Sequence, residues 1–133
     1  MFKPMPFDVW VSNVIGEAEF LANRDLVRKS WVFREGNMSW HDFDEVCEVL
    51  LEGNQPGQHL MVYGARFSHL QRDALAHFIQ TFVDTDYKIT NGDPRKSVDS
   101  SSLFHSDLWP PLEEAAKAVV KAFEGWEPPE QEQ

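Results

Sequence analysis

The sequence predicts an α/β domain in which a small, mostly parallel sheet of three to four strands packs with four or five helices. Three neighbouring segments support this fold class. Residues 59–63, HLMVY, form a short apolar run typical of a buried strand, a helical pattern begins near Ser68, and residues 87–90, YKIT, are rich in strand formers. Strand, helix and strand in this order favour a parallel crossover within one sheet.

The residues before this unit are expected to supply one strand and two helices. Residues 7–14, FDVWVSNV, partly alternate apolar with polar side chains and predict the first strand. Residues 16–32 indicate a helix that breaks or bends near residues 23–25. The second helix lies within residues 36–53.

The residues after the unit predict a loop, an edge strand and a last helix. Residues 91–102 have the composition of a loop, and residues 103–107 are expected to form a short edge strand. Pro110 and Pro111 open the last helix, and Gly125 ends it. We therefore expect one globular domain over residues 1–125, followed by a flexible acidic tail over residues 126–133.

The charge of the chain limits the partners that it can have. Its 133 residues include 22 acidic and 12 basic side chains, so the net charge is −10. Such a charge repels nucleic acid and anionic membranes, and it attracts basic proteins. The lone cysteine, Cys47, cannot form an internal disulfide, and no stretch is long and apolar enough to span a membrane or to form a signal segment. A cytoplasmic location is expected.

Residues 36–53, GNMSWHDFDEVCEVLLEG, predict a short amphipathic helix. Ser39 is the expected N-cap, and Gly53 is the expected residue that closes the last turn. One face is apolar and consists of Trp40, Phe43, Val46, Cys47, Leu50 and Leu51. The opposite face consists of Asp44, Glu45, Glu48 and Glu52, with His41.

The acidic face of this helix has no basic neighbour in the sequence. Six carboxylates and no Lys or Arg lie between Glu35 and Ala65. Like-charge pairs four residues apart cost roughly 0.2–0.5 kcal/mol each, so local stability does not favour this arrangement. One interpretation is a face that binds a basic partner. The alternatives are a solvated face of an acidic protein and pairing with the chain's own basic stretch, which contains Arg24, Arg28, Lys29 and Arg34.

The sequence contains no pattern typical of an enzyme or a metal site. The five histidines, His41, His59, His69, His77 and His105, do not have the spacing of zinc ligands, and we expect no cofactor and no metal. A rival hypothesis is a small ligand-binding or enzymatic α/β domain that uses the strand-to-helix turn at Gly64 together with His69. A third hypothesis is a structural subunit that dimerises through Phe- and Trp-rich surfaces.

The segment from residue 36 to residue 50 resembles the barstar family, which are small acidic intracellular inhibitors of ribonucleases. Ser39 takes the place of the family's Asn, Trp40 and Phe43 take the two aromatic places, and Glu45 takes that of the second acid. The family's first inhibitory Asp falls on His41, with Asp42 next to it. The resemblance implies a barstar-like α/β fold, here with a C-terminal helical extension, and carboxylates that occupy a cationic nuclease active site.

The function predicted from these observations is that of a non-catalytic acidic inhibitor of the immunity or antitoxin type. It binds and blocks a basic protein, most simply a ribonuclease or another nuclease toxin, without contacting nucleic acid or membrane itself. The expected contact residues are Trp31 as an aromatic rim, and His41, Asp42, Asp44, Glu45, Glu48 and Glu52.

Overall fold

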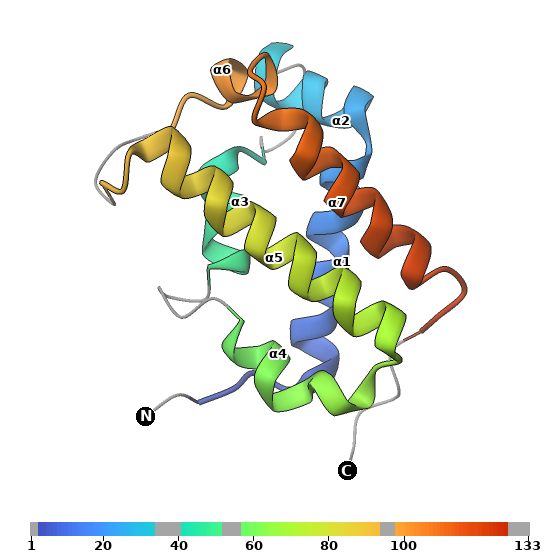
Figure 1. The fold of residues 1–133 in the computed structure, drawn as a ribbon. Coiled ribbons are helices and arrows are strands. Elements are labelled where there is room, and N and C mark those ends of the chain that lie inside the picture. The colour runs from blue at the N-terminus through green and yellow to red at the C-terminus, as the bar shows by residue number, and fades with distance from the viewer. Residues whose placement is uncertain (1–2, 34–40, 52–56, 94–97, 128–133) are drawn as a thin grey trace.

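The first structural element, α1 (Phe7–Ala22), is a helix where the sequence analysis expects a strand. The computed structural model describes residues 3–33, 41–51, 57–93 and 98–127, and these residues carry helices but no strand (Figure 1). The prediction of an α/β fold with a parallel sheet is therefore wrong, as is the barstar-like architecture that the resemblance implies. The chain has an all-helical fold.

The helical spacing of its buried residues explains α1. Trp10, Val14 and Leu21 are buried and recur at helical intervals, and Val11 and Ala18 lie on the same face. The β-branched residues of this segment favour a strand locally, but burial of one continuous stripe outweighs that preference. The break expected near residue 23 is confirmed, because α1 ends at Ala22 and Asn23 caps α2 (Arg24–Arg28). A π-helical turn, η1 (Lys29–Phe33), follows.

The two strands expected around Ser68 are also helical. Residues 59–63 lie in α4 (Gln58–Tyr63), which leads through the 3₁₀ turn η3 (Gly64–Arg66) to α5 (His69–Thr90). The helical start expected near Ser68 is confirmed, and Ser68 forms a capping box with Gln71. Residues 87–90 continue α5, in which the hydroxyl of Thr90 donates to the carbonyl of Asp86, four residues earlier. Asn91, with a φ of 55°, ends the helix.

The C-terminal part contains two further helices. The expected edge strand at residues 103–107 is replaced by α6 (Ser100–Phe104) and a turn. The last helix is confirmed as α7 (Trp109–Ala122). Trp126, in the segment predicted to be a tail, is half-buried with its ring centroid 5.1 Å from that of Phe123, whereas residues 128–133 lie outside the described ranges.

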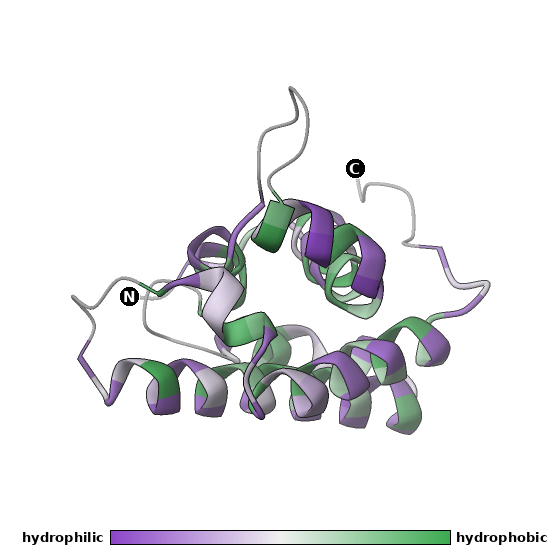
Figure 2. Cartoon of the chain, turned by 90° about the horizontal axis from the view of Figure 1, so that it is seen from above, coloured by the Kyte–Doolittle hydropathy of each residue, from purple (hydrophilic) through white to green (hydrophobic). Residues whose placement is uncertain are grey.

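The core lies where α1, α5 and α7 meet. α7 packs against both α1 and α5, and the helix α3 (Phe43–Leu50) packs against α1 (Figure 1). Figure 2 shows apolar residues on the inner sides of the helices and polar residues on their outer sides. The largest fully buried side chains are Trp10, Trp31, Phe43, Phe78, Phe82, Leu21, Leu50, Leu75, Leu103, Leu112, Glu113 and Val11.

Candidate functional site

The acidic helix begins later than the sequence analysis expects. Asp42 is the N-cap, and its side chain accepts a hydrogen bond from the backbone N–H of Glu45 at 3.0 Å. The predicted caps, Ser39 and Gly53, lie outside the described residues. Because Asp42 is the N-cap and Asp44 and Glu45 lie in the first turn, their charges lie at the positive end of the helix dipole.

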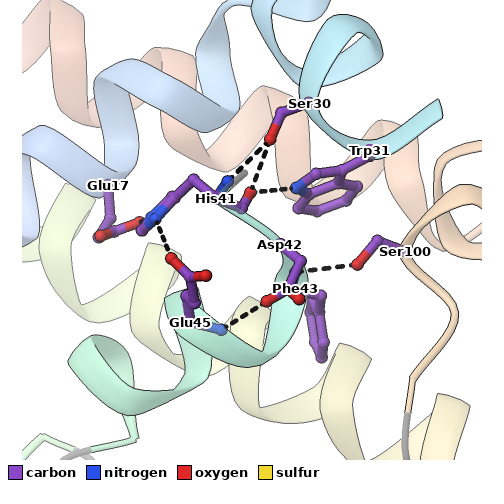
Figure 3. Close-up of polar contacts among 8 residues, drawn as sticks. All are labelled: Glu17, Ser30, Trp31, His41, Asp42, Phe43, Glu45 and Ser100. Carbon is purple, nitrogen blue, oxygen red and sulfur yellow. Dashed lines mark hydrogen bonds and ion pairs between the residues drawn. The ribbon is translucent and has the colours of Figure 1, made fainter. Parts of the chain in front are cut away.

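The apolar face of α3 fixes the helix to the core. Phe43 and Val46 are fully buried, and Leu50 is nearly so. The ring of Phe43 stacks on Phe82 of α5 with a centroid distance of 4.9 Å. Its backbone N–H donates to the hydroxyl of Ser100 in α6 at 2.9 Å, a contact drawn in Figure 3. These contacts hold α3 rigidly against α5 and α6.

The opposite face of α3 is exposed and acidic, as predicted. Asp44, Glu45 and Glu48 are all exposed, and Asp42 is half-buried beside them. Glu52 lies outside the described part of the chain. Of the described Lys and Arg side chains, none forms an ion pair with Asp44 or Glu48.

Asp86 of α5 extends this face, although the sequence analysis did not include it. Partial burial raises the pKa of Asp44, and the charges of Asp42, Asp86 and Glu48 raise it further. Partial burial also raises the pKa of Asp86. We use the name acidic face for Asp42, Asp44, Glu45, Glu48 and Asp86. Binding of a cation to this face is favourable, because it reduces the repulsion between the carboxylates.

We expect Asp44→Asn to stabilise the protein by a few tenths of a kcal/mol at neutral pH. The pKa of Asp44 is raised in the folded state, so ionisation of this group costs stability at any pH above its unfolded pKa. The gain should therefore disappear near pH 3, where Asp44 is largely protonated in both the folded and the unfolded chain. Urea unfolding of the two proteins at both pH values measures it, and a loss of stability at neutral pH would contradict the repulsion described above.

Arg24 and Arg28, in the described part of the basic stretch, do not cover the acidic face. The guanidinium of Arg24 forms two hydrogen bonds with the carboxylate of Glu113 in α7, at 2.6 and 3.0 Å. The guanidinium of Arg28 lies 5.9 Å from the centre of the Phe104 ring. Arg34 lies outside the described residues. Intramolecular masking by Arg24 and Arg28 is thereby excluded in this structure.

Trp31 does not lie on the surface. It is 1% exposed, its ring meets that of Trp109 at 5.3 Å, and its indole N–H donates to the backbone carbonyl of His41 at 2.6 Å. The prediction that it forms an aromatic rim is therefore wrong. Trp10 and Trp109 are buried as well, so these tryptophans offer no surface for the dimer of the third hypothesis.

His41 is held within the protein by two carboxylates from different helices. Its Nε2 lies 2.6 Å from Glu17 of α1, and its Nδ1 lies 3.1 Å from Glu45 of α3 (Figure 3). Burial disfavours the imidazolium, but the hydrogen bonds and charges of Glu17 and Glu45 outweigh burial and raise the pKa of His41. His41 therefore neutralises part of the charge of Glu45. Glu17 was missed, although an acid on the apolar stripe of α1 indicates a buried partner.

Cys47 is poorly suited to act as a nucleophile. Its thiol lies 3.9 Å from the carboxylate of Asp86. Burial raises the pKa of the Cys47 thiol, and the charges of Asp86 and Asp44 raise it further. The thiol therefore stays protonated at neutral pH.

The turn at Gly64 lacks the geometry that the ligand-binding hypothesis requires. Gly64 joins α4 to η3, so no strand leads into it, and that part of the hypothesis is wrong. His69 is exposed and contacts Arg72 at 3.3 Å. No group of His, Cys, Asp and Glu in the described ranges is arranged to hold a metal ion. A shallow hollow lined by Glu19, Asn23 and Arg24 is bordered by α1, α2 and α7.

The described helices include none with the length and apolar character needed to cross a membrane. Comparison of the chain with protein-family models, with curated proteins and with solved structures found no match. We therefore infer the function from the geometry of the site.

Proposed function

We propose that this protein is a non-catalytic inhibitor, of the immunity or antitoxin type, that binds a basic protein through its acidic face and blocks it. One observation carries the proposal: Asp44 and Glu48 are exposed, and no Lys or Arg among the described residues pairs with them. Arg24 and Arg28 of the basic stretch are engaged with Glu113 and Phe104.

The packing of α3 supports a binding role. Phe43, Val46 and Leu50 fix the helix to the core, so its carboxylates are presented from a rigid element and lose little entropy on binding. The net charge of −10 adds long-range attraction for a basic partner, which speeds association at low salt.

A nuclease is the class of partner that we propose. The active site of such an enzyme carries cations that bind phosphates, and carboxylates spaced along one helix can take the places of those phosphates. The resemblance of residues 36–50 to barstar inhibitors agrees with this class of partner. We place the pair in the cytoplasm, where a lone reduced thiol such as that of Cys47 is common.

The proposal is tested with a charge reversal and a control of equal charge. Asp44→Lys combined with Glu48→Lys changes the net charge from −10 to −6, and so does Asp73→Lys combined with Glu124→Lys on other exposed parts of the surface. Wild-type protein is used to capture its partner from cells, and the dissociation constant is then measured for all three proteins at about 0.05 M and about 0.3 M salt.

We expect the reversal on α3 to weaken binding at least about tenfold more than the control does, with most of the difference at low salt. Cleavage of RNA or DNA by the captured partner should be inhibited by the wild type and by the control, and not by the α3 variant. Equal binding of the two variants would show that the acidic face is only a solvated surface.

A further inference from the structure

His41 lies immediately before α3 and joins this helix to α1. Its backbone N–H donates to the hydroxyl of Ser30 at 2.9 Å, and its backbone carbonyl accepts from the indole of Trp31 at 2.6 Å. Its ring lies between the carboxylates of Glu17 and Glu45, as Figure 3 shows. Glu17 is only 8% exposed, and the contact with this ring offsets the cost of burying its charge.

The two contacts of the ring require a proton. An imidazolium donates from both nitrogens and can bond to both carboxylates at once. A neutral imidazole donates from one nitrogen only, and the lone pair of the other nitrogen then faces a carboxylate oxygen at close range. The arrangement of Glu17, His41 and Glu45 is therefore complete only in the protonated form.

We infer that His41 is a proton-dependent latch, which holds the first turn of α3 against α1 while it bridges Glu17 and Glu45 and loosens that turn when the proton leaves. Among the described residues, the charged groups that face the ring are Glu17 from α1 and Glu45 from α3. Phe20 of α1 contacts the ring edge-on at 4.9 Å, and Ser30 and Trp31 of η1 form hydrogen bonds with the backbone of His41.

Release of the latch is local. The buried side chains of Phe43 and Val46 and the hydrogen bonds to Ser30 and Trp31 do not depend on the proton. Loss of the proton therefore changes the order of the first turn, and with it the placement of Asp44 and Glu45, without unfolding the protein. The effect of the latch on partner binding rests on the proposed function, whereas the latch itself does not.

The direction of the pH dependence follows from the pKa of His41. This pKa is raised in the folded state, so the contribution of His41 to the latch is fully present below the ordinary histidine pKa of about 6.5 and is lost as the pH rises through the folded value. Burial raises the pKa of Glu17, so at acidic pH this carboxylate becomes neutral and its ion pair with His41 is lost as well. Linkage fixes the size of the effect. The latching equilibrium falls about tenfold for each unit by which the pKa of latched His41 exceeds that of unlatched His41, for which the unfolded chain serves as the reference.

The test uses the isolated chain, so that failure of the proposed function does not affect it. NMR measures the pKa of His41 in the folded protein and in the same chain unfolded in urea. The observed hydrogen-exchange rates of the amides of residues 45–50 are compared with their intrinsic rates, and the ratio of intrinsic to observed rate gives the protection of α3 over the same pH range. Amides of α7 serve as the internal reference.

We expect the protection of α3 relative to α7 to fall across the titration of His41, by about tenfold for each unit of difference between the pKa values of His41 in the folded and the unfolded chain. Glu17→Gln should lower the pKa of His41 and reduce this factor. His41→Gln, which cannot titrate, should give low protection at all pH values. The inference is overturned if His41 titrates alike in the folded and unfolded chains, or if α3 keeps constant protection while His41 titrates.

Discussion

Replacing Phe43 with alanine is expected to lower the free energy of unfolding by about 3–5 kcal/mol. Its side chain is fully buried, stacks on Phe82 at 4.9 Å and meets the edge of Trp31 at 6.2 Å. Truncation removes apolar area from the core and leaves a cavity between α3 and α5, which rigid neighbours cannot fill. Urea unfolding followed by circular dichroism measures the loss.

The control for this substitution is Phe33→Ala. Phe33 is 59% exposed, and we expect its truncation to change stability by no more than about 0.5 kcal/mol. If Phe43→Ala costs no more than this control, α3 is not fixed to the core by its apolar face. That result would contradict the conclusion that α3 holds the carboxylates of the acidic face rigidly.

Glu113→Ala is expected to lower the free energy of unfolding by about 2–4 kcal/mol at neutral pH. Glu113 is 1% exposed and receives hydrogen bonds from Arg24 of α2 and from the indole N–H of Trp109 at 3.2 Å. The substitution removes the attachment of α2 to α7 and leaves the buried indole without its acceptor. Glu114→Ala, at the exposed neighbouring position, is the control.

The pH dependence separates the charge of Glu113 from its packing. The hydrogen bond from Arg24 lowers the pKa of Glu113, against the opposing effect of burial. Stability from the ionised group is therefore present above the ordinary glutamate pKa of about 4.3 and is lost as the pH falls through the folded value. The difference between wild type and Glu113→Ala should shrink at low pH. An equal difference at low and neutral pH would mean that Glu113 acts by packing alone.

The fold class could not be predicted from the sequence because local strand preference and helical spacing disagree. Residues 7–14 contain β-branched and aromatic side chains, yet the buried positions Trp10, Val11 and Val14 follow a helical period. Residues 59–63 form an apolar run too short to separate a strand from a helix by periodicity. Met61 and Val62 are in fact exposed, so the run is not a fully buried segment.

The helices with strong end signals were predicted best. α5 starts near Ser68 as expected, and the pair Pro110 and Pro111 lies in the first turn of α7. The start of α3 was ambiguous, because both Ser39 and Asp42 are good N-caps with an acid three residues later. The observed start at Phe43 coincides with the contact of its backbone N–H with Ser100, which is distant in sequence.

The exposed carboxylates of the acidic face followed from the helical pattern alone. The contacts of Glu17 with His41 and of Asp86 with Cys47 could not be predicted in this way. Glu17 lies 24 residues before His41, and Asp86 lies 39 residues after Cys47. Such contacts depend on how α1 and α5 pack against α3. The same holds for Arg24, which pairs with Glu113 and not with the acidic face.

We propose that the acidic face of α3 and α5 contacts a basic partner, and amide NMR signals of the labelled protein test this contact when the captured partner is added. The largest changes should fall on residues 42–48 and around Asp86. Changes confined to the exposed apolar residues Met61, Val62 and Leu70, with the signals of α3 unmoved, would contradict it.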